Sequence, residues 1–177
     1  GVMAHQLSLF ERADRHFLAS QDLAYRSEDD ALMSQVLNNL GTLRKDQGRF
    51  EEALAYFDQA IERLPPRDLK FPWQSKADTL LRLGRYAESK SYYEKAQALN
   101  REIGDDEGLA HTLRGLAEIA RRQGDADTAE RLLCENEAIC HKLDHARGLS
   151  WTVQSYGDIA CLRGDFGRIR VERGVNI

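Results

Sequence analysis

Apolar residues recur at steps of three and four along most of the chain, the spacing that places side chains on one face of an α-helix. Glycines, a Pro65-Pro66 pair and short polar stretches interrupt this pattern, so we expect helices joined by short links. The pattern predicts a lone helix from Ser8 to Ala24, followed by helix pairs over residues 29–46 with 50–64, 70–83 with 86–103, 105–123 with 125–143, and 146–163 with 165–173.

A short motif marks the turn inside each predicted pair. It begins at Gly48, Gly84, Gly124 and Gly164, with a weaker copy at Ser8, so the starts are 40, 36, 40 and 40 residues apart. Such a period is typical of helical-repeat proteins, in which each unit is stabilised by its neighbours. Each glycine is expected to take a left-handed conformation after the first helix of its pair.

Charged and polar residues at the predicted helix ends are of the types that stabilise helix termini. Asp125 and Asp165 follow turn glycines and are expected to cap the next helix, as is Ser8 through a capping box with Glu11. Acidic pairs at helix starts and basic pairs at helix ends complement the helix dipole. These pairs are Asp29-Asp30, Glu51-Glu52, Asp105-Asp106, Arg44-Lys45 and Arg121-Arg122.

The same offsets from each turn carry the residues expected to form the core. Small side chains let two helix backbones approach closely, and large ones fill the remaining space. The first helices contribute Leu37, Leu40, Gly41, Arg44, Trp73, Lys76, Ala77, Leu80, Leu113, Leu116, Ala117, Ala120, Val153, Tyr156, Gly157 and Ala160. The second helices contribute Phe10, Ala13, Phe17, Ser20, Phe50, Ala53, Phe57, Ala60, Tyr86, Ser89, Tyr93, Ala96, Ala126, Ala129, Leu133 and Asn136.

The stretch Leu37 to Pro65, LNNLGTLRKDQGRFEEALAYFDQAIERLP, closely resembles a tetratricopeptide repeat, and the later copies resemble its longer variety of roughly 40 residues. The resemblance implies an all-α fold, a right-handed superhelical solenoid of antiparallel helix pairs with about 4 to 4.5 repeats. Residues 1–177 are then expected to form one repeat domain. Its units are a partial one over 1–28, then 29–66, 67–104, 105–144, and 145–177, the last either a frayed cap or a unit cut short. That unfinished unit and the start on Gly1 favour a piece of a longer array.

The composition of the chain argues against nucleic-acid-binding and membrane proteins. The chain has 25 Lys and Arg against 29 Asp and Glu, a net charge of −4, with the basic residues interleaved among acids, which argues against direct nucleic-acid binding. No apolar run is long enough for a membrane span and no signal peptide is visible, so no membrane partner is expected. Three cysteines without a Cys-x-x-Cys pair indicate reduced thiols and a cytoplasmic protein.

Motifs for catalysis or cofactors are missing from the sequence. Neither glycine-rich phosphate loop occurs, and the sequence around Ser150 lacks the second glycine of a nucleophile elbow. The most site-like cluster, Cys134, Cys140, His141 and His145, could supply zinc ligands, but a helix break is expected before Gly148 and the ligand count is low. We therefore predict a protein that is not an enzyme and that holds no metal or cofactor.

In a stack of helix pairs the first helices line the concave face, and the residues between their core positions would face a groove. This row mixes hydrogen-bonding groups, both charge signs and two large aromatic side chains, so it is predicted to bind a protein or peptide. The alternative interpretation is a solvated polar face with Trp151 packed on the adjacent unit. The predicted groove residues are Gln35, Asn38, Thr42, Lys45, Phe71, Gln74, Asp78, Leu81, His111, Arg114, Glu118, Arg121, Trp151, Gln154, Asp158 and Cys161.

The leading hypothesis is a non-enzymatic adaptor or scaffold that binds a protein or peptide. Two other hypotheses stay open. The chain could be the ligand- or peptide-sensing portion of a larger bacterial regulator, a class in which the longer repeat variety occurs. It could also be an oligomerisation module that forms a homodimer through its terminal helices, either the Phe10/Phe17 helix or the unfinished last unit.

Overall fold

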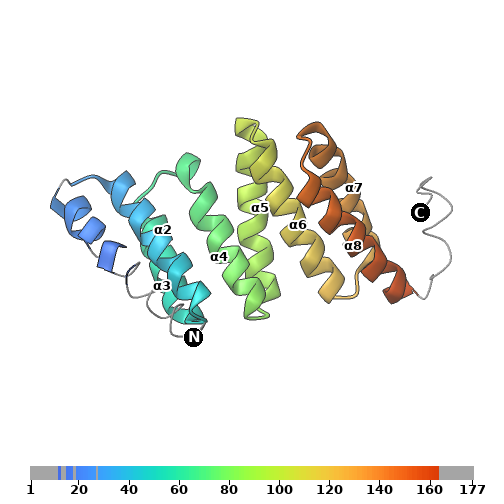
Figure 1. The fold of residues 1–177 in the computed structure, drawn as a ribbon, viewed down its shortest axis with the longest axis horizontal. Helices are drawn as coiled ribbons and strands as arrows, with labels where there is room; N and C mark the ends of the chain where they lie inside the picture. Colours follow the sequence, from blue (N-terminus) through green and yellow to red (C-terminus); the bar gives the residue numbers. More distant parts are fainter. Residues whose placement is uncertain (1–11, 13–14, 18, 27, 164–177) are drawn as a thin grey trace. The chain divides into compact units, whose positions relative to one another are not determined.

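The computed structural model describes residues 12, 15–17, 19–26 and 28–163, except for the side chain of Leu162. It separates into two compact units, Gly1–Lys95 and Ala96–Ile177, and the division falls within one helix. The helices after residue 28 are α2 (Asp30–Asp46), α3 (Phe50–Glu62), α4 (Lys70–Arg82), α5 (Tyr86–Ile103), α6 (Asp106–Arg122), α7 (Ala126–Lys142) and α8 (Ala146–Arg163), with a 3-10 turn η1 (Pro66–Asp68) before α4 (Figure 1). No strand occurs among the described residues.

The turns follow the sequence pattern. Gly48, Gly84 and Gly124 have φ angles of 76°, 76° and 77°, so the predicted left-handed conformation is confirmed at these three glycines. Each of them ends the first helix of a pair with backbone bonds back to the last turn, such as the Gly124 N–H to the Arg121 carbonyl at 3.1 Å. Gly164 lies outside the described residues.

Aspartate side chains fix the starts of three helices. Asp125 Oδ1 accepts a hydrogen bond from the Thr128 N–H at 3.0 Å, which confirms the predicted cap of α7. Asp29 and Asp105 cap α2 and α6 in the same way, each at 2.9 Å. The predicted caps at Ser8, Glu11 and Asp165 lie outside the described residues.

In the first unit, α2 and α3 pack closely because a glycine faces an aromatic ring. A Cβ atom on Gly41 would lie 2.5 Å from the Phe57 ring, and Phe57 is fully buried. Two polar residues at predicted core positions are accommodated by partners. Ser89 donates to the Ala77 carbonyl at 2.7 Å, and Lys76 bonds to the Asp58 carboxylate and, at 3.0 Å, to the Tyr92 hydroxyl.

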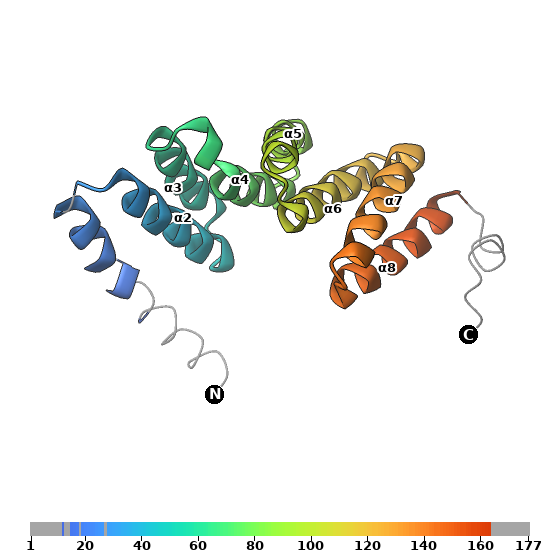
Figure 2. The ribbon, with the colours of Figure 1, turned by 90° about the horizontal axis from the view of Figure 1, so that it is seen from above.

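In the second unit, α6, α7 and α8 lie side by side (Figures 1 and 2), with α7 in contact with both neighbours. Asn136 occupies the position where a small core residue is usual, and its amide is fully engaged. It donates to the Ala110 carbonyl at 2.7 Å and accepts from the Thr152 hydroxyl at 3.0 Å. This buried amide therefore links all three helices of the unit.

Of the four residues of α8 that were predicted to lie in the core, two are exposed. Tyr156 and Ala160 are buried, but Val153 is 68% exposed and a Cβ atom on Gly157 would meet nothing within 4 Å. In α2, the equivalent positions pack against the second helix of the same pair. The second helix predicted for α8, residues 165–173, lies outside the described residues, as do Phe10 and Ala13 of the N-terminal copy.

Among the described helices, none combines the length and the apolar character needed to cross a membrane. The continuous single array and its right-handed superhelical course stay predictions.

Candidate functional site

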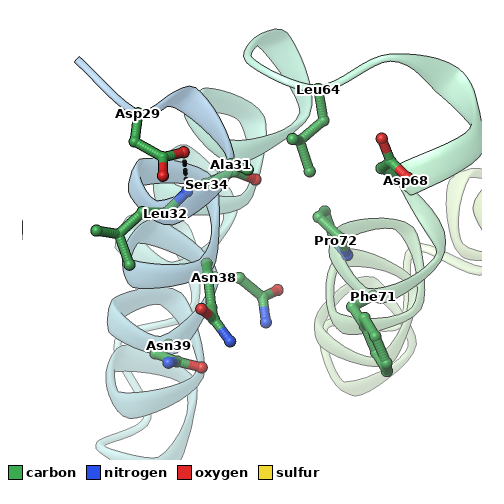
Figure 3. Close-up of a pocket in the computed structure, with 11 residues that line it drawn as sticks. Asp29, Ala31, Leu32, Ser34, Asn38, Asn39, Leu64, Asp68, Phe71 and Pro72 are labelled. Carbon is green, nitrogen blue, oxygen red and sulfur yellow. Dashed lines mark hydrogen bonds between the residues drawn. The ribbon is translucent and has the colours of Figure 1, made fainter. Parts of the chain in front are cut away.

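An open groove of about 600 Å³ lies between α2 and α4 in the first unit (Figure 3). The first helices of two successive pairs form its walls, and the link between α3 and α4 closes one side. Its lining residues are Asp29, Ala31, Leu32, Ser34, Gln35, Asn38, Asn39, Leu64, Asp68, Phe71 and Pro72.

Helix α2 supplies the polar wall because its other face is fixed to α3. Ser34 is buried and donates to the Ala60 carbonyl of α3 at 3.0 Å. Leu37 and Leu40 are also buried, so Gln35, Asn38 and Asn39 are left along the groove (Figure 3). Helical spacing thus places a short row of amide side chains on one wall.

Helix α4 supplies the apolar wall through the residues around its first turn. The η1 turn redirects the chain after Pro65, and Leu69 is buried directly before α4. Pro72 is buried in the first turn, where its missing N–H costs no hydrogen bond. Phe71 is 60% exposed, with the Lys70 ammonium 4.6 Å from its ring centroid.

The polar groups of the groove can both donate and accept hydrogen bonds. Asn38 Oδ1 is buried and has no hydrogen-bond partner among the described residues. The two carboxylates lie at the rim: Asp29 caps α2, and Asp68 lies 3.8 Å from Arg67. No Lys, Arg or His belongs to the lining. An amide row beside an exposed aromatic ring suits an extended peptide, whose backbone alternates donors and acceptors.

Only part of the predicted groove row meets here. Gln35, Asn38 and Phe71 line the groove, whereas Thr42 donates to the Asn38 carbonyl of its own helix at 3.0 Å. Gln74 is 92% buried. The other predicted residues of the first unit, Lys45, Asp78 and Leu81, are half-buried, and the Asp78 carboxylate accepts from the Tyr93 hydroxyl.

The predicted residues of the second unit divide between a cavity and an ion-pair cluster. His111 and Arg114 line a cavity of about 140 Å³ bounded by α6, α7 and α8. Glu118 binds Arg121 and Arg122. Burial raises the pKa of Glu118, but hydrogen bonds from these two arginines lower it by more, so it lies below its ordinary value. Of the rest, Asp158 lies 3.6 Å from Arg121, Trp151 is half-buried, and Gln154 and Cys161 are exposed.

Sequence reasoning missed residues that reach both sites from helix starts and links. Leu64 and Asp68 belong to the link before α4, and Pro72 lies in the first turn of α4; none of the three was predicted as a groove residue. In the second unit, Cys140 and His145 line the small cavity; the sequence predicted them as candidate zinc ligands and not as neighbours of His111 and Arg114. The spacing of residues from the turn glycine predicts which side chains share a face of one helix. It does not predict which side chains of a link between helices line a site.

The Cys/His cluster does not assemble as one site. Helix α7 ends at Lys142 and α8 begins at Ala146, which confirms the expected break between His141 and His145. Cys140 is buried, whereas Cys134 and both histidines are exposed. Within the described part of the chain, no group of His, Cys, Asp or Glu residues has a metal-binding arrangement.

Comparisons with known proteins agree with the fold. The family model described as tetratricopeptide repeat matches residues 1–65 and 73–140. The crystal structure of BtubC (BKLC) from P. vanneervenii is similar with a TM-score of 0.64, at 21% sequence identity over 89% of this chain and 84% of that chain. At this identity the likeness shows the fold alone. No curated protein sequence matches the chain significantly.

The all-α helical-repeat fold class is therefore confirmed. Tetratricopeptide repeats commonly bind protein partners and are generally scaffolds without catalytic activity. Because the matched segments cover well over half of the residues, this chain belongs to the tetratricopeptide repeat family.

Proposed function

We propose that the chain is a non-enzymatic scaffold that binds an extended peptide segment of a protein partner in the α2–α4 groove. The observation that carries the proposal is that an exposed Phe71 ring and a row of amide side chains line the same groove of about 600 Å³. Exposed aromatic rings are favoured anchors at protein interfaces because they bury a large area at a low cost in conformational entropy.

The groove offers the two interactions that an extended peptide needs. Phe71, with Leu32 and Leu64, would pack against an apolar side chain of the partner. Asn38, with its buried and unpaired Oδ1, would accept a hydrogen bond from a peptide N–H, and its amide nitrogen would donate to a peptide carbonyl. Side-chain amides bind the partner's backbone and not one particular side chain, so the apolar anchor would provide most of the sequence preference.

The family supports this proposal because protein binding is common among tetratricopeptide repeats. Trp151 and Gln154 belong to the second unit, and their part in partner binding stays a prediction. A homodimer through the terminal helices, a cytoplasmic location and the absence of direct nucleic-acid binding stay predictions.

A random peptide display selection on the whole chain tests the proposal. Peptides enriched on the wild type should lose about tenfold in affinity on Phe71→Ala and on Asn38→Ala, because each change removes one central contact. Tyr25→Ala is the matched control: Tyr25 is 77% exposed and lies outside the groove lining. Circular dichroism should show unchanged helicity in all three variants. Selected peptides that bind the groove variants as tightly as they bind Tyr25→Ala would contradict the proposal.

A further inference from the structure

The small cavity of the second unit is lined by more basic than acidic side chains. Helix α6 contributes successive residues of one face, α7 contributes two buried residues, and the start of α8 closes the third side. Three basic side chains and one acidic side chain reach this volume of about 140 Å³. The full lining is Glu107, Ala110, His111, Arg114, Asn136, Cys140, His145 and Gly148.

Arg114 is held in place by an aromatic ring and not by a carboxylate. Its guanidinium lies 5.8 Å from the centroid of the Trp151 ring. Within the described residues it makes no ion pair, although Arg121, two turns further along α6, binds Glu118 at 2.8 Å. The charge of Arg114 is therefore available to an incoming anion, and the stacked geometry leaves the edge of the guanidinium as a hydrogen-bond donor.

The start of α8 differs from the start of α6 at the capping position of the repeat. Forty residues before His145 and Gly148, Asp105 Oδ1 accepts from the Gly108 N–H at 2.9 Å. His145 replaces that aspartate, and its Nδ1 would lie 2.8 Å from a Cβ atom on Gly148, the same distance that separates Asp105 Oδ2 from a Cβ atom on Gly108. The equivalent carboxylate is thus missing at the position where α6 carries one.

The buried wall of the cavity adds no competing charge. The Asn136 amide is occupied by Ala110 and Thr152. Burial raises the pKa of the Cys140 thiol, Arg114 lowers it and the Glu137 carboxylate raises it further, so the thiol stays neutral at pH 7. A Cβ atom on Gly148 would lie 2.4 Å from Cys140 Sγ, so the room at this wall depends on glycine.

We propose that this cavity binds the carboxylate of an acidic side chain from a protein partner. Arg114 would bind the carboxylate through charge-assisted hydrogen bonds, with the ring N–H groups of His111 and His145 as further donors. The Gly148 N–H would donate to the same group, as the Gly108 N–H donates to Asp105. Glu107, which is exposed, is the acidic residue of the lining, and Glu137 acts on Cys140 from α7, so both carboxylates oppose the anion. The site lies wholly in the second unit and does not depend on peptide binding in the α2–α4 groove.

Titration of the full chain by ¹H–¹⁵N NMR tests the site with defined probes. The first probe is N-acetylglutamate α-amide, whose single charge is the side-chain carboxylate, and its matched neutral control is N-acetylglutamine amide. N-acetylglycine carries a terminal carboxylate and separates the two sources of this group. The expected result is a saturable shift of the Gly148 amide and Trp151 indole signals with the glutamate probe, and none with the glutamine probe.

Variants then separate the loss of the site from the loss of the fold. Arg114→Gln should lower the affinity for the glutamate probe about tenfold, as expected for the loss of one charge-assisted contact. Glu107→Gln should raise this affinity, because it removes a negative charge from the lining. Arg131→Gln removes one positive charge from an exposed position of α7 outside the cavity and should leave the affinity unchanged. His145→Asp should abolish binding while raising the melting temperature, because it restores the cap that α6 has.

Equal shifts with the glutamine probe would overturn the proposal, as would equal losses in Arg114→Gln and Arg131→Gln. Stronger binding of N-acetylglycine than of the glutamate probe would overturn the assignment to a side chain. A negative result for this cavity would not change the expected results for Phe71→Ala and Asn38→Ala in the peptide selection. The two proposals can therefore fail separately.

Discussion

Helices α2 and α8 carry the same repeat positions but bury them differently. Leu37 on α2 is 1% exposed and Gly41 faces the Phe57 ring, whereas Val153 and Gly157 at the equivalent positions of α8 are exposed. Both helices have the same spacing from the turn glycine. On α2 these positions are covered because α3 packs against them, whereas among the described residues α8 contacts α7 and no later helix. A repeat offset therefore identifies which face is available for packing, and the neighbouring helix decides whether that face is buried.

The largest expected effect is at Leu37. Leu37→Ala should destabilise the first unit by about 3 kcal/mol, because it removes a fully buried side chain and leaves a cavity. Urea denaturation followed by circular dichroism measures the free energy of unfolding. Val153→Ala is the paired change on α8 and should stay within about 0.5 kcal/mol of the wild type, since its side chain is exposed. Equal losses of unfolding free energy in Leu37→Ala and Val153→Ala would contradict the difference in burial between α2 and α8.

A second test uses the glycine positions. Gly41→Ala should cost about 1–3 kcal/mol, because the added methyl group would collide with the Phe57 ring in a close-packed helix pair. A double variant with Phe57→Leu should recover part of this loss, since the smaller side chain gives the methyl group room. A neutral Gly41→Ala result would mean that α2 and α3 are packed less closely than their side chains indicate.

A third test concerns the ion pairs near the end of α6. Glu118→Gln should cost about 1 kcal/mol at pH 7, because it removes a carboxylate that binds Arg121 and Arg122. The folded pKa of Glu118 is lowered, so its contribution is present above the unfolded pKa of about 4.3 and is lost as the pH falls through the folded pKa.

Unfolding free energies at pH 7 and at pH 3 check this sign. The difference between wild type and Glu118→Gln should shrink at pH 3. Glu94→Gln is the control, since Glu94 is exposed and lies 3.9 Å from Lys90. A difference that grows in acid would contradict the assigned ion pairs.

The smallest effect is expected at the counterpart of Gly41. Gly157→Ala should stabilise α8 by about 0.5–1 kcal/mol, because alanine is the better helix former and the new methyl group meets no atom within 4 Å. Local hydrogen exchange of α8 amides measures this change directly. Destabilisation by Gly157→Ala would show that this face of α8 is covered.

Much of the fold could be predicted because the repeat positions use local chemistry. The predicted start of α3 at residue 50, the bounds of α5 at 86–103 and those of α8 at 146–163 agree with the structure. Left-handed glycines and aspartate caps act within a few residues of their own position, so their effect is readable from the sequence alone. Lys76 and Ser89 depart from the repeat pattern and are still buried, because Asp58, Tyr92 and the Ala77 carbonyl satisfy their polar groups.

The candidate sites were less predictable, since each depends on segments distant in the sequence. The sequence predicted Asn38 and Phe71 as groove residues, but not that the link through Asp68 closes the groove beside them. It predicted Gln74 in the same row, yet Gln74 is buried. In the second unit, the juxtaposition of Arg114 with the start of α8 required α7 to bring the two helices together.

The sequence by itself determined the helices, their turns and the faces on which they pack, because hydrophobic period, glycine conformation and capping are local properties. Only the tertiary structure decided which of those faces are covered, and where polar side chains from different helices meet. Burial and cavities depend on neighbours many residues away along the chain, and a repeat offset does not specify those neighbours. For this reason Gly41 and Gly157 look alike in the sequence and differ in the folded protein.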